Sequence, residues 1–536
     1  MRRLLVPLVV LAAALYVAAR PVGPAPAMGS FLDPVDGVWA LARNADPPAR
    51  AEARITGLTA PVEVLTDDRG VPHVFAKSEE DAWRVQGYLV ARDRLFQMEL
   101  TSRAAGGTLS GLFGPRALEA DRTTRRRGLP WGAERLAESE DSSSLLSRAV
   151  LAYAEGVNAW IDGMRPADLP LEYRLLGARP ARWEPVSTYY FFSQMALTLA
   201  YDEATIERLR VRALVGAAAT EALFPLNSPI QEPIQPNGQG APRYDFVRPL
   251  PPPGPPDSAA WSAAEERAAV ELALGLTPRR RGDGDAIGSN NWAVSPARTA
   301  AGYPLLSGDP HLELTLPSIW YEIHLHVDGG PDVAGVTFPG SPGVIIGFNR
   351  NVAWSFTNTG ADVRDYYVET VDDSLAPARY RLDGAWKPVT RRVEFIRGRH
   401  AELLRTDTLY FTHRGPMVRE RGRWVSVRWT PFEVRPGEDF IRLDRAASVA
   451  DWLDGWKDFG APAQNGIVAG REGSIAIRST GRYPVRPGNG RGDELRDGSR
   501  SASDWTGYLP AAEYPFALNP AQGFLASANQ QPLDPR

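Results

Sequence analysis

One dipeptide in the sequence, Gly288–Ser289 within IGSNNWAV (residues 287–294), could supply both halves of a nucleophilic reaction. If the bond between these two residues were cut, Ser289 would carry a hydroxyl nucleophile and a free α-amino group. An α-amino group has an ordinary pKa of about 7.7–8.0, which suits a general base near neutral pH, so no catalytic histidine would be required. Gly288 would allow the strained backbone that attack of the hydroxyl on the preceding carbonyl needs. An ordinary Gly-Ser turn that leads into a strand is the alternative that these residues alone leave open.

The composition excludes several other chemistries. The chain has no cysteine, which rules out disulfides, thiolate catalysis, cysteine-ligated zinc and iron–sulfur clusters. Six histidines and no HExxH pattern argue against a histidine-rich metal site. The 60 Lys and Arg against 64 Asp and Glu leave a net charge of −4, which would not attract nucleic acid or an anionic membrane. No GxSxG elbow is present, so an α/β-hydrolase is disfavoured, but a Ser-His-Asp triad on another fold remains an alternative.

The elements around this dipeptide change in kind along the chain. Residues 61–75 alternate apolar and polar types around a DDRG turn and predict a hairpin, and a helix is predicted to begin after Ser78. Further helical patterns cover residues 143–163 and 187–214. The stretch 226–287 is too rich in Pro, Gly and charge to join a core, apart from a short helical piece at 261–276, and it would give self-cleavage a flexible segment just upstream. After Gly288 the pattern is of strands separated by turns, which predicts an α+β or layered αββα architecture.

The N-terminus resembles an export signal. Arg2 and Arg3 precede an apolar run over residues 4–19, which Pro7 interrupts and which is short for a membrane span of about 20 residues. Residues 1–28 are therefore expected to be a signal peptide or an uncleaved anchor. In either case the rest of the chain would lie in the periplasm or cell envelope, with membrane contact only if the segment is retained.

Four ordered blocks resemble the penicillin acylase family of N-terminal nucleophile hydrolases. The block at 64–100 resembles the opening of that family's α subunit, and the blocks at 288–325, 464–486 and 504–532 resemble parts of its β subunit. The resemblance implies a four-layer αββα sandwich of the α+β class with a mainly helical α-subunit region. It also implies an α subunit at 29–225, a spacer propeptide at 226–288 and a strand-rich β subunit at 289–536. This β subunit would be incomplete, because family members continue beyond SANQQPLDPR.

Carried over residue by residue, the resemblance implies an active site. Ser289 matches the nucleophile, with its own α-amino group as base. Asn465 matches the side-chain donor of the oxyanion hole, and the backbone N–H of Asn358 matches the second donor. Arg486 matches an arginine that the family keeps beside the site. His311 matches a position that is His in the cephalosporin and acyl-homoserine lactone branches and Gln in the penicillin G branch.

The resemblance also implies a structural calcium ion and an apolar acyl pocket. The metal would be held by Asp362, Asp365 and the carbonyl of Arg364, oxygen donors of the kind that calcium prefers. The glutamate that completes the site in the family falls on Thr205 here, with Glu203 and Glu207 close by. The pocket positions are Met195, Leu199, Leu312 and Ile346, and since none is aromatic they favour a linear fatty-acyl group over a phenylacetyl group.

The resemblance therefore implies a self-processing amidohydrolase that cleaves N-acylated small molecules of the acyl-homoserine lactone or β-lactam type through an acyl-enzyme on Ser289. No organic cofactor is implied. The mature form would be an α/β heterodimer held by noncovalent contacts. Two alternatives remain: an inactive relative that acts as an envelope binding or scaffold protein, and a hydrolase with an internal triad.

Overall fold

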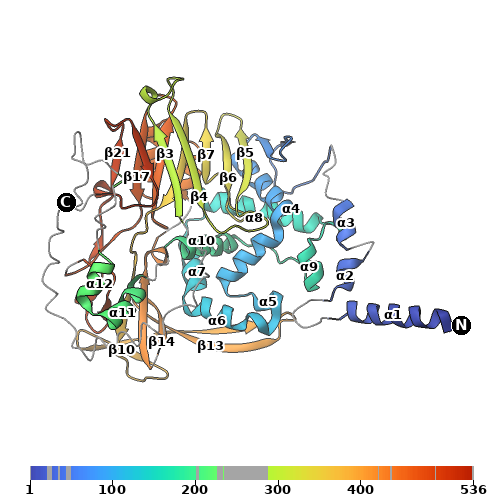
Figure 1. Cartoon of the computed structure of the whole chain (residues 1–536), viewed down its shortest axis with the longest axis horizontal. Coiled ribbons are helices and arrows are strands. Elements are labelled where there is room, and N and C mark those ends of the chain that lie inside the picture. The colour runs from blue at the N-terminus through green and yellow to red at the C-terminus, as the bar shows by residue number, and fades with distance from the viewer. Residues whose placement is uncertain are drawn as a thin grey trace.

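The computed structural model describes residues 2–20, 27–33, 37–43, 50–200, 204–225, 233–234, 288–420, 422–434, 438–488 and 490–533. Within these residues, helices dominate the part of the chain before residue 225 and strands dominate the part after Gly288. Figure 1 shows the two kinds of element packed side by side in one body. The fold therefore belongs to the α+β class, as the sequence predicted.

Two long helices, α4 (Glu79–Gly106) and α8 (Leu145–Gly163), lie against each other and form the centre of the helical part. The side chain of Ser78 caps α4 by accepting a 3.2 Å hydrogen bond from the N–H of Asp81, and acidic residues fill the first turn, where the helix dipole favours them. The two backbones touch, because a Cβ at Gly156 would lie 1.8 Å from the carbonyl oxygen of Arg84. The other helices are α1 (Arg2–Ala18), α2 (Gly29–Leu32), α3 (Val38–Arg43), α5 (Ser110–Phe113), α6 (Leu118–Arg126), α7 (Leu129–Ser139), α9 (Leu171–Leu176), α10 (Pro185–Ala200), α11 (Ala204–Val215), α12 (Ala217–Leu223), α14 (Glu438–Leu443) and α15 (Val449–Trp456).

A nine-stranded sheet is the largest in the described structure. Its strands pair in an antiparallel sense except for β2 and β5, which run parallel. The order is β1 (Glu63–Thr66), β2 (Pro72–Ala76), β5 (Tyr321–Val327), β6 (Asp332–Thr337), β7 (Ile346–Asn349), β8 (Val352–Asn358), β16 (Gln464–Gly470), β17 (Ile475–Thr480) and β21 (Phe516–Leu518). The hairpin β1–β2 thus joins a segment from the start of the chain to strands that come more than 240 residues later.

A three-stranded sheet packs on one face of the nine-stranded sheet. Its order is β22 (Phe524–Ser527), β3 (Gly288–Val294) and β4 (Leu305–His311), and both β3 and β4 contact β8. The sheets approach closely, since a Cβ at Gly308 would lie 2.1 Å from the Oγ of Ser355. Helix α15 packs against β16, where Gly466 leaves room for the rings of Trp452 and Trp456. All seven residues of β16 are buried, as expected for a strand covered on both faces.

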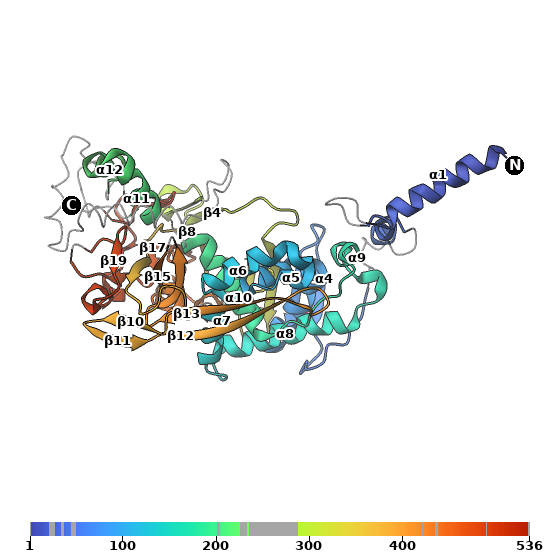
Figure 2. The same cartoon turned by 90° about the horizontal axis from the view of Figure 1, so that it is seen from below.

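A third sheet lies below the helices in the view of Figure 1. It has the order β12 (Thr390–Arg397), β13 (Leu403–Thr412), β14 (Gly415–Glu420), β15 (Arg423–Trp429), β9 (Arg364–Glu369) and β19 (Leu495–Asp497). Two small sheets pair β10 (Arg379–Leu382) with β11 (Ala385–Pro388) and β18 (Pro484–Val485) with β20 (Gly507–Tyr508). Figure 2 shows the long β12–β13 hairpin running along α6, where ion pairs of 2.6 Å and 2.5 Å join Arg122 to Asp407 and Arg125 to Glu394.

The predicted elements can now be placed. The hairpin at 61–75 is β1–β2, the helix after Ser78 is α4, and the pattern at 143–163 is α8. The pattern at 187–214 forms two helices, α10 and α11, rather than one. The helical piece expected at 261–276 lies outside the described residues.

The described residues supply three layers of the implied sandwich: helices, the nine-stranded sheet and the three-stranded sheet. The outer face of the small sheet carries exposed apolar side chains, among them Trp292, Leu305 and Phe524. At the other end of the molecule, α1 extends away from the body in both views, with its apolar residues exposed. Among the described helices, none combines the length and apolar character that a membrane crossing demands.

Candidate active site

Ser289 is the second residue of β3 and is buried between the two sheets. Its hydroxyl donates a 2.5 Å hydrogen bond to the carbonyl oxygen of Gly288, the residue on the other side of the peptide bond that self-cleavage would break. The same hydroxyl oxygen accepts a 3.3 Å hydrogen bond from the backbone N–H of His311 on the neighbouring strand β4. The strand pairing of Gly288 with His311 fixes this arrangement.

Asn529 connects the backbone of Ser289 to the end of β8 in the large sheet. Its Oδ1 accepts a 2.5 Å hydrogen bond from the N–H of Ser289, and its Nδ2 donates a 2.7 Å hydrogen bond to the carbonyl of Asn358. The backbone of Asn529 is left-handed, with φ of 67°, a conformation that Asn tolerates better than most residues. One amide side chain therefore fixes the nitrogen that would become the catalytic amine.

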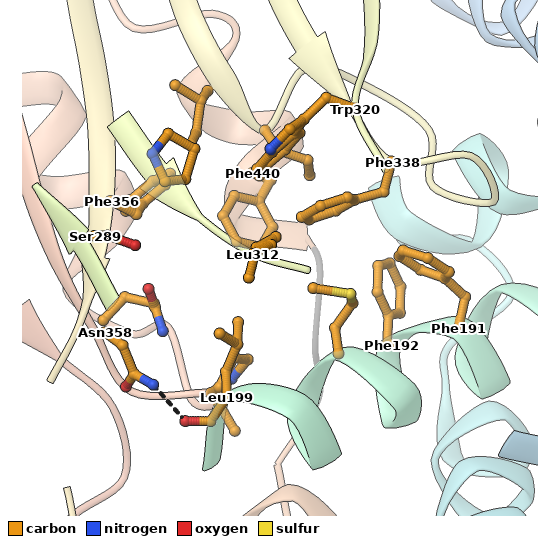
Figure 3. A pocket seen from close by; sticks show the side chains of 17 residues that line it. Phe191, Phe192, Leu199, Ser289, Leu312, Trp320, Phe338, Phe356, Asn358 and Phe440 are labelled. Carbon is orange, nitrogen blue, oxygen red and sulfur yellow. Dashed lines mark hydrogen bonds between the residues drawn. The ribbon is translucent and has the colours of Figure 1, made fainter. Parts of the chain in front are cut away.

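The two residues implied for the oxyanion hole lie next to each other on β8 and β16. The Nδ2 of Asn465 donates to Oγ1 of Thr357 at 3.2 Å and to the carbonyl of Asn358 at 3.4 Å, and the hydroxyl of Ser479 donates to its Oδ1 at 2.5 Å. The side chain of Asn358 donates to the carbonyl of Leu199 at 2.7 Å, a bond drawn in Figure 3. The carbonyl of Asn358 thus accepts hydrogen bonds from both Asn465 and Asn529, and Asn529 in turn contacts Ser289.

The ring of His311 pairs with its neighbour Asp309. Its Nε2 lies 3.0 Å from Oδ2 of Asp309, and both side chains are exposed. In the described part of the chain, no hydrogen bond joins a ring nitrogen of His311 to the Ser289 hydroxyl. The structure therefore brings the backbone N–H of His311 to the nucleophile and the Nδ1 side of its ring close to Gly288.

Arg486 belongs to a buried ionic cluster on the third sheet. Its guanidinium donates to both carboxylate oxygens of Asp365, at 3.0 and 3.1 Å, and to the carbonyl and carboxylate of Asp362, at 2.9 and 3.0 Å. Arg496 and the indole N–H of Trp505 contact the same Asp365 at 2.8 and 2.6 Å. These contacts satisfy a carboxylate that is fully buried.

This cluster bears on the predicted calcium site. Both expected carboxylates already face guanidinium groups, so calcium could enter only if Arg486 and Arg496 moved away. The side chains at Thr205, Glu203 and Glu207 lie outside those that the structure describes. Among the side chains that are described, no group of three or more His, Asp or Glu has the arrangement of a metal site. Calcium therefore stays a prediction.

A pocket of about 750 Å³, including the open space at its mouth, begins at Ser289 and extends between α10 and the nine-stranded sheet. In Figure 3 the Ser289 oxygen and Asn358 lie at one end, and apolar side chains fill the walls. Helix α10 contributes one face of its surface, with residues at positions 191, 192, 195 and 199. The four expected positions, Met195, Leu199, Leu312 and Ile346, all line the pocket.

The expectation of an aliphatic lining is wrong for the pocket as a whole. Six aromatic rings share the wall with the four expected residues, and they come from Phe191, Phe192, Trp320, Phe338, Phe356 and Phe440. Trp320 and Phe338 stack with their centroids 4.2 Å apart. The four positions alone do not reveal these rings, because the rings reach the pocket from α10, α14, strand β8 and loops distant in sequence.

One titratable group is next in sequence to a residue of this wall. Asp439 precedes Phe440 in α14, and burial raises the pKa of its carboxyl to about 7. The carboxyl is therefore largely protonated at mildly acidic pH in the folded chain. No local sequence pattern indicates a role for Asp439 or for Asn529, whose contact with Ser289 spans 240 residues of chain.

Comparison with known proteins identifies the family. The family model for penicillin amidase matches residues 61–536. The chain belongs to the penicillin amidase family. It is 32% identical over 495 residues to penicillin acylase 2 proenzyme of Pseudomonas sp. (strain SE83), a match that covers 90% of this chain and 60% of that protein.

Two further proteins are similar to this chain. Acyl-homoserine lactone acylase QuiP of Pseudomonas aeruginosa is 30% identical over 522 residues, covering 93% of this chain and 58% of that protein. A solved thermostable penicillin G acylase from Alcaligenes faecalis is 27% identical and matches with a TM-score of 0.43 over 46% of this chain and 45% of that one. The chain spans about 60% of the length of penicillin acylase 2 proenzyme.

Proposed function

We propose that this chain is a self-processing amidohydrolase that cleaves the amide bond of N-acylated small molecules through an acyl-enzyme on Ser289. The observation that carries the proposal is the position of the Ser289 hydroxyl, 2.5 Å from the Gly288 carbonyl oxygen and at one end of an apolar pocket. The relatives named penicillin acylase and acyl-homoserine lactone acylase support the choice of an amide substrate.

The first reaction would act on the chain itself. The hydroxyl oxygen of Ser289 adds to the carbonyl carbon of Gly288, the C–N bond breaks, and the hydroxyl proton passes to the departing nitrogen. Water then hydrolyses the resulting ester between Gly288 and the Ser289 oxygen. The product is a free α-amino group on Ser289, which Asn529 already holds by its N–H. Hydrolysis of a second peptide bond, at the end of the α subunit, would release the spacer at 226–288 as a propeptide. Residues 29–225 and 289–536 would then be the α and β subunits of a heterodimer.

The second reaction would act on substrate. The α-amino group takes the proton of the hydroxyl as Ser289 attacks the substrate carbonyl, and the same proton is delivered to the leaving amine. The Nδ2 of Asn465 and the backbone N–H of Asn358 would donate to the developing oxyanion. A water molecule then hydrolyses the acyl ester and restores the enzyme.

The pocket supports an apolar acyl group as the part of the substrate that is recognised. Its walls combine aromatic rings with Met195, Leu199, Leu312 and Ile346 and hold few polar groups. Hydrolysis of decanoyl, phenylacetyl and acetyl amides of the same amine would test this. The first two should be cleaved much faster than the acetyl compound, and equal rates for all three would contradict the assignment.

Three secondary assignments accompany this proposal. Residues 1–28 would direct the chain to the periplasm or cell envelope, as a cleaved signal or an anchor. A structural calcium ion would require Asp362 and Asp365 to exchange their arginine partners for the metal. No organic cofactor would take part.

The deciding experiment is intact mass measurement with N-terminal sequencing of the purified chain, with Ser289→Ala as the matched variant. A fragment that begins SNNWAV, absent from the variant, is the expected result. An uncut chain without amidase activity would favour the envelope binding protein. An uncut chain with activity that is lost in His311→Ala would favour an internal triad.

A further inference from the structure

Three of the six histidines gather on one face of the nine-stranded sheet, outside the site described above. His73 lies on β2, and His324 and His326 lie on β5. The parallel pairing of these strands places His73 directly beside His324. Their Nδ1 atoms are 3.0 Å apart, and the rings meet edge to face.

Carboxylates lie on the far side of both rings. The Nε2 of His324 is 2.8 Å from Oδ1 of Asp332, and the Nε2 of His73 is 3.6 Å from Oδ2 of Asp67. The carboxylate at Nε2 of His324 favours the tautomer with its proton there, which leaves Nδ1 of that ring with a lone pair. With the proton of His73 on Nδ1, the contact between the rings is a hydrogen bond. With that proton on Nε2, both Nδ1 lone pairs are available to a cation.

We propose that His73 and His324 bind a divalent transition metal ion, such as Zn²⁺, through their Nδ1 atoms. Two nitrogens on a tetrahedral Zn²⁺ with bonds of about 2.0–2.1 Å stand about 3.4 Å apart, so the rings need to separate by only a few tenths of an ångström. Water would fill the other positions, because both side chains are partly exposed. Asp332 and Asp67 would orient the rings as outer partners.

The charges around the pair favour a divalent cation. The carboxylates on this face outnumber the guanidinium groups: Asp67, Glu322, Asp328 and Asp332 against Arg69 and Arg350. Arg350 and His326 both contact Asp332. The metal itself would therefore meet two neutral imidazoles backed by negative charge.

Such an ion would link β2 to β5, and thus the segment before residue 225 to the strands after Gly288. This role does not depend on cleavage at Ser289.

Equilibrium dialysis of the full chain against Zn²⁺, followed by metal analysis, tests the proposal. We expect one Zn²⁺ per chain, a rise in Tm that Mg²⁺ does not produce, and affinity at least about tenfold weaker in His73→Ala and in His324→Ala. His73→Gln, which keeps most of the side-chain volume, separates loss of a ligand from loss of packing. His400→Ala and His311→Ala should bind as the native chain does. No bound Zn²⁺, or binding that survives both ligand substitutions, would overturn the site and leave the pair bridged by a proton only.

Discussion

The side-chain carbonyl of Asn529 accepts a 2.5 Å hydrogen bond from the backbone N–H of Ser289, across 240 residues of chain. The other end of the same amide donates to Asn358. The nitrogen proposed as general base and the residue proposed as oxyanion donor are therefore held by one side chain. Their relative position depends on a residue close to the end of the described structure.

Replacing Asn529 by Ala should slow amide hydrolysis about 5- to 150-fold, since two hydrogen bonds that position the reacting groups are lost, at a cost of about 1–3 kcal/mol. The measurement is kcat/KM with a decanoyl amide. Asn519→Ala is the matched control, because Asn519 is also a left-handed Asn that accepts a backbone N–H, from Ile475. Equal losses in both variants would mean that Asn529 acts only on stability.

Replacing Asn465 by Ala or Asp should lower kcat by about 100- to 1000-fold, as expected when an oxyanion donor is removed. KM should change little, because the donor acts mainly on the transition state. Ser479→Ala, which removes the hydrogen bond to Oδ1 of Asn465, should give a smaller loss. If Ser479→Ala were as damaging as Asn465→Ala, orientation of the amide rather than donation would be the main effect.

Arg486→Ala should destabilise the fold by about 3–5 kcal/mol, because it leaves the fully buried Asp365 with fewer cationic partners. Arg442→Ala is the control. Its ion pair with Glu438 involves a guanidinium that is 54% exposed, and its loss should cost less than about 1 kcal/mol. The measurement is denaturant unfolding of both variants.

The same measurement with and without Ca²⁺ tests the metal prediction. A Ca²⁺-dependent gain in stability of the native chain would support a calcium site at Asp362 and Asp365. If Ca²⁺ has no effect on the native chain, the arginine cluster occupies the place of the ion.

The free energy of unfolding should fall as the pH rises from about 4 to 7, because over this range the carboxyl of Asp439 is protonated in the folded chain and ionised in the unfolded chain. Burial raises the pKa of this carboxyl to about 7 in the folded chain, whereas an unfolded Asp titrates near 3.9. Between pH 4 and 7 the folded state therefore holds a proton that the unfolded state has released. The stabilisation that this proton gives the folded state is lost above pH 7. Asp439→Asn should remove this slope and raise Tm at pH 8, as measured by calorimetry between pH 4 and 8. An unchanged slope would show that the carboxyl is hydrated in solution.

The sequence predicted the elements whose signals are local. The DDRG turn gives the β1–β2 hairpin, the cap at Ser78 and the acidic turn after it give the start of α4, and alternation gives the strands after Gly288. The resemblance added Ser289, Asn358 and Asn465, which the structure places on adjoining strands in contact through Asn358 and Asn529.

Features made by distant segments were not predictable in this way. The stacking of Trp320 on Phe338 and the approach of Phe191 from α10 arise only when two sheets and a helix close on one another. The His73–His324 contact depends on a parallel register between strands 251 residues apart. No local sequence pattern predicts that register.

The hairpin β1–β2 has a consequence for assembly. Since β2 pairs with β5, residues 63–76 are part of a sheet completed by residues after 321. A single polypeptide closes this sheet within one molecule, at a rate that does not depend on protein concentration. Two halves made separately would have to find each other in solution, each with an unpaired strand edge open to aggregation. Translation as one chain therefore protects the edges of this sheet from aggregation during folding. This holds whether or not the bond before Ser289 is later cleaved.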